Sequence, residues 1–393
     1  MKKILIVSEV FWPEDFIIND LAREWRNKGH DVHVLSQYPS YPGSYVFDGY
    51  RNEGCTVEDW DGIKIHRFPF IEGYRDSKVK KFSNYIKFVR EGKKLACSIA
   101  GSFDAIFVSQ TGPLSVALPA LAAGKKYGIP VSIWTADIWP DVLWSYGIPQ
   151  CRLIRFIADR FIGKVYFRCN HILVTSRRFS DTISRYTDKE IVYAPNWLRP
   201  VEEKKSSLQL DQSEFNFTFT GNVSLYQNLE NTVMGFRKAG LQNALLNIVG
   251  DGSYLEQLKE TVREKDIKNV RFFGRIPYAQ VAAVLSQSQV LVLPLVNNEG
   301  VMKTEPFKLQ SYLNAGRPIL GILGGSGKEI IEENSLGLTA LPDDIDDIAR
   351  TFRESVDFYK KQSAQVKERS LQLLQTRFDK TSIIEKINRT MQL

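Results

Sequence analysis

The residues best suited to chemistry lie in segment 303–318, KTEPFKLQSYLNAGRP. Its pattern predicts a polar loop, then a short helix that Gly316 ends, then the apolar strand 319–320. The first N–H groups of a helix lack partners and carry partial positive charge, so an anion binds there readily. Lys303 and Lys308 add full positive charges at the same point. The segment therefore predicts an anion-binding loop, or else an ordinary connection with solvated lysines.

A second set of candidates follows predicted strands in the first half of the chain. Asp137 comes after the apolar run 131–134, so its carboxylate is expected at the carboxyl edge of a parallel sheet, where ligands bind. There it could accept a proton or position a hydroxyl; the alternative is a capping role before Trp139-Pro140. Other polar candidates for this edge are Glu9, Glu14, Ser109, Gln110 and Thr111.

Glycines follow two predicted strands in the second half. Gly221 and the run Gly250-Asp251-Gly252 would let a ligand approach the backbone closely, because glycine has no side chain. Tight turns are the alternative reading.

Apolar runs and helical patterns alternate along the whole chain and position these residues. The predicted strands are 3–8, 31–35, 63–68, 105–108, 131–134, 172–174 and 191–193, then 215–220, 245–249, 270–273, 290–293 and 319–320. A proline-rich and charged linker at 195–207 separates the two groups. The expected fold class is α/β, with two Rossmann-like doubly wound domains facing across a cleft. Their expected bounds are 1–197 and 198–375, and a C-terminal helix within 376–393 returns to the N-terminal domain.

Composition limits the function classes. The 393 residues suffice for two domains with full cores, and the net charge of +7 indicates an anionic partner. Four separated cysteines without a CxxC pair indicate neither zinc nor a disulfide framework, and favour a reducing cytosol. The most apolar stretch, 105–124, is interrupted by prolines, so any membrane contact is expected to be peripheral.

The sequence argues against a nicotinamide cofactor and a metal. The first strand is followed by SEVFWP rather than G-x-G-x-x-G, and Gly250-Asp251-Gly252 lacks a third glycine. The acidic run 343–347 reads as a helix cap, and the four histidines do not cluster. No cofactor and no metal are expected.

Motifs in order along the chain resemble the retaining glycosyltransferases of the GT-B fold called family 4. In the second half these are FTGN at 219–222, IVGDG at 248–252, FFGRIP at 272–277 and segment 303–318. In the first half, PSYP, GYR, DGI and DIWPD resemble a subgroup that builds bacterial surface polysaccharides and includes N-acetyl-L-fucosamine transferases. These four motifs occupy residues 39–42, 49–51, 61–63 and 137–141.

This resemblance implies a nucleotide-diphosphate sugar bound mainly by the second domain and an acceptor bound by the first. The usual E-x7-E acids of family 4 align with Lys303 and Ser311 and are therefore lost, with Glu305 as a nearby substitute. Pro306-Phe307-Lys308 resembles a P-S-K-type sequence, which makes Lys308 the candidate diphosphate contact. Asp137, Lys308 and Glu305 are the catalytic candidates. The implied donor-binding residues are Gly221, Asn222, Gln227, Gly250, Asp251, Gly252, Arg275, Lys303, Ser311 and Tyr312.

Basic and apolar residues interleave between residues 78 and 94. This pattern suits an amphipathic helix on an anionic leaflet, although a solvated face over a core stripe is the alternative; no nucleic-acid motif accompanies it. The expected membrane-facing residues are Lys78, Lys80, Lys81, Lys87, Arg90, Lys93 and Lys94.

Together these features predict a retaining, metal-independent glycosyltransferase on the cytoplasmic face of the plasma membrane. It would move a sugar, possibly N-acetylated and deoxy, from a UDP-linked donor to a polyprenyl-linked saccharide in O-antigen, capsule or related synthesis. A nucleotide-sugar epimerase of the same fold and an inactive binding subunit are the alternatives.

Overall fold

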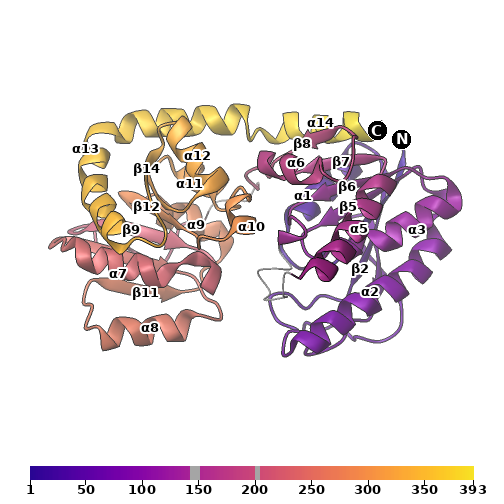
Figure 1. Ribbon diagram of the computed structural model, residues 1–393, viewed down its shortest axis with the longest axis horizontal. Coiled ribbons are helices and arrows are strands. Elements are labelled where there is room, and N and C mark those ends of the chain that lie inside the picture. The colour runs from indigo at the N-terminus through magenta and orange to yellow at the C-terminus, as the bar shows by residue number, and fades with distance from the viewer. Residues whose placement is uncertain (142–150, 200–203) are drawn as a thin grey trace. The chain divides into compact units, whose positions relative to one another are not determined.

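The computed structural model describes residues 1–141, 151–199 and 204–393. Contacts divide the chain into two compact units (Figure 1). Unit 1 comprises Met1–Ala194 and Thr381–Leu393, and unit 2 comprises Pro195–Lys380. The expected linker at 195–207 thus follows directly after the first part of unit 1, and its residues 200–203 lie outside the described part of the chain.

Unit 1 is built on an eight-stranded sheet in the order β3-β4-β2-β1-β5-β6-β7-β8. All neighbouring pairs are parallel except β3 with β4. The strands are β1 (Lys3–Ser8), β2 (Asp31–Gln37), β3 (Thr56–Trp60), β4 (Ile63–Phe68), β5 (Ala105–Gln110), β6 (Val131–Thr135), β7 (His171–Val174) and β8 (Ile191–Tyr193). The helices are α1 (Ile17–Asn27), α2 (Lys78–Ile99), α3 (Ala117–Tyr127), α5 (Arg152–Arg168), α6 (Arg177–Ile183) and α14 (Lys380–Met391).

Successive side chains of the buried strands pack on opposite faces of this sheet. One face, with Leu5 and Val7 from β1, packs under α2, α3 and α5 in a single apolar cluster (Figure 1). On the other face Trp25 of α1 stacks edge-on against Phe107 and donates its indole N–H to Asn388 of α14 at 2.7 Å. The C-terminal helix is therefore held in unit 1 by a partly buried hydrogen bond as well as by apolar packing.

Unit 2 has a six-stranded, fully parallel sheet in the order β11-β10-β9-β12-β13-β14. The strands are β9 (Phe215–Thr220), β10 (Ala244–Val249), β11 (Val270–Gly274), β12 (Val290–Pro294), β13 (Ile319–Ile322) and β14 (Gly337–Ala340). The helices are α7 (Leu229–Ala239), α8 (Leu255–Glu264), α9 (Tyr278–Leu285), α10 (Glu299–Met302), α11 (Leu309–Ala315), α12 (Gly325–Glu333) and α13 (Ile345–Thr376). Apolar clusters cover both faces of this sheet, one with α7, α8 and the start of α13, the other with α11 and α12.

Two strands depart from the sequence-based expectation. β3 and β14 are edge strands that the apolar pattern did not predict, because β3 is largely exposed and β14 is short. The turn between β3 and β4 contains Asp61 and Gly62, both with positive φ, which is the usual signature of a hairpin. Within the described residues, no helix has the length and apolar character needed to cross a membrane.

Candidate functional site

Two glycine turns interlock at the carboxyl ends of β9 and β10 in unit 2. Gly221, Gly250 and Gly252 have φ values of 137°, 152° and 159°, which side chains other than glycine rarely allow. A Cβ on Gly250 would overlap the carbonyl oxygen of Gly221, and one on Gly252 would overlap that of Val223. The glycines are therefore required by the close approach of the two turns, and they leave exposed backbone at the carboxyl edge of the sheet, where doubly wound folds generally bind their ligands.

The amino group of Lys308 lies over the first of these turns. Its Nζ is 2.9 Å from the position that a Cβ on Gly221 would take and 4.0 Å from the centre of the Phe219 ring. It donates to Oε1 of Gln227, in the 3₁₀ turn Leu225–Gln227. Loss of hydration lowers the pKa of Lys308 to about 7, and no carboxylate in the described part of the chain lies within ion-pair distance of it. An approaching anion would supply the missing countercharge.

The helix that follows Lys308 corrects one part of the sequence argument. Gly316 ends α11 in the left-handed conformation as expected, but α11 has only seven residues. The dipole of so short a helix is small, so the positive charge at this point comes from the Lys308 side chain rather than from the helix.

Two other charged candidates of segment 303–318 are already in ion pairs. Lys303 Nζ lies 3.0 Å from Glu299 Oε1. Glu305 is buried, and its Oε1 accepts from Arg377 Nη2 at 2.8 Å. This ion pair joins the loop to Arg377, directly after α13. Glu305, the expected substitute for the lost E-x7-E acids, therefore has a structural contact of its own.

Tyr312 and Ser311 lie side by side in α11 but in different surroundings. Tyr312 is fully buried, accepts a hydrogen bond from Thr220 N–H at 3.0 Å and donates to Val292 O at 3.1 Å. Its expected contact with a donor is therefore wrong, because its hydroxyl ties α11 to two strands. Ser311 is half-buried, with Oγ 3.4 Å from the Tyr278 hydroxyl.

The remaining donor candidates of unit 2 lie at the rim of the glycine turns. Asn222 and Arg275 are exposed, and Asn222 Oδ1 lies against Gly252. Asp251 Oδ1 accepts the Gly252 N–H at 2.7 Å, so it stabilises its own turn.

In unit 1, three adjacent strands bring a second group of candidates together. Glu9 follows β1, Gln110 ends β5 and Asp137 follows β6, in the sheet order β1-β5-β6. Gln110 Nε2 donates to Gly112 O at 2.6 Å and to Asp137 O at 3.0 Å, and Glu9 Oε2 is 2.7 Å from the position of a Cβ on Gly112. Gln110 thus ties the loop after β5 to the Asp137 backbone, and the Glu9 carboxyl lies against Gly112 of the same loop.

Burial makes both carboxyls weak acids. Desolvation, reinforced by the Glu9 carboxylate, raises the pKa of Asp137 to about 7. Desolvation also raises the pKa of Glu9 to about 7, although the charges of Arg75 and Lys81 oppose the increase. Groups that titrate near neutral pH are suited to proton transfer.

The other acceptor-side candidates are Glu14, Ser109 and Thr111, and two of them are buried. The Glu14 carboxylate accepts the backbone N–H groups of Phe11, Ser40 and Tyr41 at 3.1, 2.8 and 2.7 Å. Ser109 is 1 % exposed, so a direct contact with a substrate is not available to it. Thr111 is half-buried.

The basic residues of α2 do not all face outward, which corrects the predicted membrane-facing set. Lys78, Lys80, Arg90, Lys93 and Lys94 are exposed. Lys87 is half-buried and donates to Phe70 O at 3.1 Å, and Lys81 is half-buried near Glu9 and Arg75. Between the exposed cations, the apolar side chains of Val79, Phe82 and Ile86 are 76%, 65% and 55% exposed.

Solved glycosyltransferase structures share the architecture of both units. Sucrose-phosphate synthase from Thermosynechococcus elongatus superimposes with a TM-score of 0.77 at 12% identity over 100% of this chain and 98% of that one. The Anabaena protein HepE, solved with UDP and glucose, gives a TM-score of 0.69 at 13% identity over all of both chains. The expected α/β fold with two Rossmann-like domains, the GT-B fold, is confirmed.

Two family models match consecutive parts of the chain. The model described as "Glycosyl transferase 4-like domain" matches residues 17–197, and "Glycosyl transferases group 1" matches residues 200–370. The chain belongs to the group 1, family 4-like glycosyltransferases. Lys308 lies in the part of the chain that the group 1 model matches, and Asp137 lies in the part that the 4-like model matches.

Curated relatives of the glycosyltransferase are distant. "Probable glycosyltransferase WbjE" of Pseudomonas aeruginosa is 25% identical over 268 residues, 63% of this chain and 65% of that protein. The match thus spans just under two thirds of that relative's length. "Putative colanic acid biosynthesis glycosyl transferase WcaI" of Escherichia coli is 20% identical over 321 residues, 75% of each chain.

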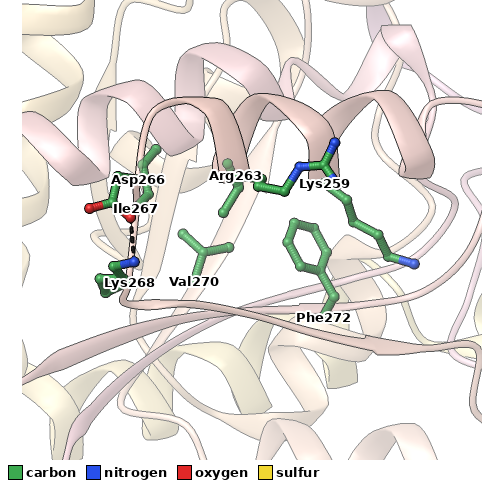
Figure 2. A pocket seen from close by; sticks show the side chains of 8 residues that line it. Lys259, Arg263, Asp266, Ile267, Lys268, Val270 and Phe272 are labelled. Atoms are coloured by element: carbon green, nitrogen blue, oxygen red, sulfur yellow. Dashed lines mark ion pairs between the residues drawn. The ribbon is translucent and has the colours of Figure 1, made fainter.

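A separate pocket of the glycosyltransferase lies between α8 and the edge strand β11 (Figure 2). It has a volume of about 270 Å³, and Val262, Ile267, Val270 and Phe272 are its apolar lining residues. Arg263 and Lys268, at the same pocket, form ion pairs with Glu260 and Asp266. The pocket shares no residue with the glycine turns or with Lys308.

Sequence reasoning missed Phe219, which lies against the Lys308 amino group, and Arg75, whose charge favours ionised Glu9. Gln227 and Lys81 were candidates, but not as partners of Lys308 and Glu9. Only the family motif FTGN contained a signal for Phe219. Arg75 lies in a loop, and Lys81 was assigned to the wrong side of its helix. Within the described residues, no group of three or more His, Cys, Asp or Glu side chains could hold a metal ion.

Proposed function

We propose that the chain transfers a sugar from a UDP-linked donor to a lipid-linked saccharide in bacterial surface-polysaccharide synthesis, with retention of anomeric configuration. Family membership supports sugar transfer, and the similarity to WcaI, named for colanic acid biosynthesis, supports a role in surface polysaccharides. The solved complex of HepE with UDP and glucose supports the choice of UDP. The resemblance to N-acetyl-L-fucosamine transferases makes an N-acetylated deoxy sugar the first donor to test.

One observation carries this proposal: a desolvated lysine amino group lies over a glycine turn at the ligand edge of unit 2. In the family reaction, negative charge develops on the departing diphosphate. A fixed ammonium in a poorly hydrated place stabilises that charge more than water does. Lys308 is within reach of the exposed backbone of Gly221, so backbone and ammonium could hold the same phosphate.

The acceptor is assigned to unit 1, where Asp137 and Glu9 lie at the corresponding sheet edge. A carboxylate there would take the proton of the attacking hydroxyl or fix its position. Activity is expected to persist in EDTA, because Lys308 rather than a bound cation would neutralise the diphosphate.

We further assign the exposed surface of α2 to contact with an anionic leaflet, on the cytoplasmic side of the plasma membrane. Val79, Phe82 and Ile86 are spaced at i, i+3 and i+7, so they lie on one side of the helix. Exposed cations flank them, which suits insertion of apolar side chains beneath lipid phosphates. Leu153, Phe156 and Ile157 form a second set of exposed apolar residues, on α5.

A thermal-shift panel of nucleotides and nucleotide sugars tests donor binding first. A ligand at 100 times its Kd stabilises its protein by about 2.7 kcal/mol, so UDP-linked compounds should raise the Tm clearly while GDP-linked ones should not. NMR of the product with a polyprenyl-linked acceptor then reports the anomeric configuration. Conversion of the donor without an acceptor would instead indicate an epimerase, and UDP-sugar binding without turnover would indicate an inactive binding subunit.

A further inference from the structure

We propose that Glu9 and Asp137 work as one carboxyl pair that shares a single proton and receives the proton of the acceptor hydroxyl, with Gln110 as the positioning residue. The inference rests on the proposed function for its substrate, a sugar hydroxyl. It goes beyond that function by joining two candidates into one titrating unit and by adding Arg75 and Lys81 as its countercharges.

The geometry that joins the two carboxyls runs through the loop after β5. Glu9 Oε2 lies against Gly112, where a Cβ would approach it to 2.7 Å. Gln110 Nε2 binds the carbonyls of Gly112 and Asp137 at 2.6 and 3.0 Å. A side chain at 112 would displace the Glu9 carboxyl, so the glycine keeps that carboxyl at the shared edge.

Gln110 also shows that this edge is not a simple packed core. It is 0 % exposed, and its Oε1 has no hydrogen-bond partner among the described residues. Buried side-chain oxygens are rarely left unsatisfied, and such exceptions often mark functional positions. The residues Glu9 and Asp137 themselves are only partly buried, so a ligand can reach them.

The charges around the pair come from several elements. Arg75 in the loop before α2 and Lys81 in the first turns of α2 favour ionised Glu9, whereas Glu14 disfavours it. Glu9 in turn disfavours ionised Asp137. With two cations beside Glu9 and repulsion between the carboxyls, one carboxylate and one carboxylic acid are the expected state near neutral pH.

The proton balance of the step is simple. The O–H bond of the acceptor breaks and its proton passes to the carboxylate of the pair. The acceptor oxygen bonds to the anomeric carbon of the donor sugar, and the bond from that carbon to the diphosphate oxygen breaks with its electron pair on the diphosphate. The pair then releases the extra proton to solvent, which restores its starting state.

Carboxyl titration by ¹³C NMR tests the pair directly, with full-length protein labelled at Asp and Glu side-chain carbons. The signals that disappear in Glu9→Gln and in Asp137→Asn identify the two carboxyls. In the wild type, these two signals should titrate in two coupled steps, separated by more than about one pH unit. In Asp137→Asn, the Glu9 signal should titrate in one step, at lower pH than the upper step of the wild type. Gln110→Leu should bring the two steps closer together.

The control is Glu72→Gln, which removes an exposed carboxylate from the loop before α2 and should leave both curves unchanged. Near-UV circular dichroism identifies any variant that does not fold. If Glu9 titrated in one step, at the same pH in the wild type and in Asp137→Asn, the two carboxyls would not be coupled and the proposed pair would be refuted. Binding of UDP with uncoupled carboxyls would refute this inference alone, whereas coupled carboxyls without UDP binding or transfer would refute the proposed function.

Discussion

The carboxyl ends of the two sheets collect opposite chemistries. In unit 1, β1, β5 and β6 end in the carboxyls of Glu9 and Asp137; in unit 2, β9 and β10 end in glycine turns beneath the amino group of Lys308. Loss of hydration raises the pKa of both acids and lowers that of the base, so all three have a pKa of about 7. One edge can accept a proton near neutral pH, and the other can bind an anion that restores the charge of its lysine.

In the proposed reaction, this difference assigns proton transfer to unit 1 and stabilisation of the leaving group to unit 2. A group that takes up a hydroxyl proton must be a carboxylate of raised pKa, while a group that stabilises a leaving diphosphate must be cationic when the anion is present.

The largest expected effect comes from Asp137. Asp137→Asn removes the proposed proton acceptor and should lower transfer by about 10²–10⁴-fold, while the Kd for UDP stays within about twofold, because the nucleotide is proposed to bind at the other sheet edge. Single-turnover assays and isothermal titration measure the two quantities. Loss of UDP affinity together with transfer would break the division of roles and make Asp137 a structural residue.

The second largest effect on transfer is expected from Lys308. Lys308→Ala removes the ammonium that we propose stabilises the departing diphosphate, and it should lower kcat at saturating donor at least tenfold, which corresponds to about 1.4 kcal/mol in the barrier. Lys328→Gln is a matched control, since Lys328 is a partly exposed lysine of the same unit that pairs with Glu332 at 3.7 Å. Near-normal kcat in Lys308→Ala would remove the central support for the donor site.

The surface of α2 should give a smaller effect, seen in membrane binding rather than in catalysis. Changing Lys78, Lys80, Lys93 and Lys94 to Gln removes four exposed cations, each of which contributes about 1 kcal/mol near an anionic leaflet. Co-sedimentation with anionic vesicles should fall sharply, and added salt should weaken binding of the wild type. Transfer to a short water-soluble acceptor should persist.

The control for this surface changes four exposed lysines of unit 2, Lys265, Lys268, Lys360 and Lys361, to Gln. Equal vesicle binding by both quadruple variants would show that net charge alone matters, and the assignment of α2 would then fail.

The sequence predicted those features that local pattern determines. Apolar runs located the buried strands. Gly316 ends α11 because the chain leaves the helix in the left-handed backbone conformation, which glycine adopts readily. The strand order β1-β5-β6 has no local signal, so Glu9 and Asp137 were predicted for the same sheet edge but not as a pair. Glu305 shows the same limit, because its partner Arg377 lies 72 residues away in sequence.

The basic helix shows a different kind of error. Residues 78, 81 and 87 cannot share one side of a helix with 3.6 residues per turn, so charge density alone did not define a face. Val79, Phe82 and Ile86 have the spacing of one side and are exposed, whereas Lys87 turns back to Phe70. The apolar residues, rather than the lysines, locate the candidate membrane surface.

The smallest expected effect is on the free energy of unfolding. Its pH dependence has opposite signs for Asp137 in unit 1 and Lys308 in unit 2. The folded-state pKa of Asp137, about 7, exceeds its ordinary value of 3.8, so its favourable contribution is complete below pH 3.8 and is lost as pH rises through 7. The pKa of Lys308 falls from 10.5 to about 7, so the unfolded state binds more protons between these values and stability decreases as pH falls towards 7. Asp137→Asn should therefore stabilise unit 1 by about 1–2 kcal/mol at pH 8 and little at pH 4, after allowance for partial solvent screening.

Lys308→Met should stabilise unit 2 by a similar amount at pH 7 and progressively less towards pH 10. Urea unfolding followed by Trp fluorescence reports unit 1, since every tryptophan except Trp197 precedes residue 195, and hydrogen exchange in β9 reports unit 2. Glu14→Gln is the contrasting variant, because its carboxylate accepts three backbone N–H groups and its loss should destabilise unit 1 by about 1–3 kcal/mol. If Asp137→Asn and Lys308→Met were also destabilising at every pH, both groups would be structural, and the two edges would not be the poorly hydrated reactive sites that their pKa values indicate.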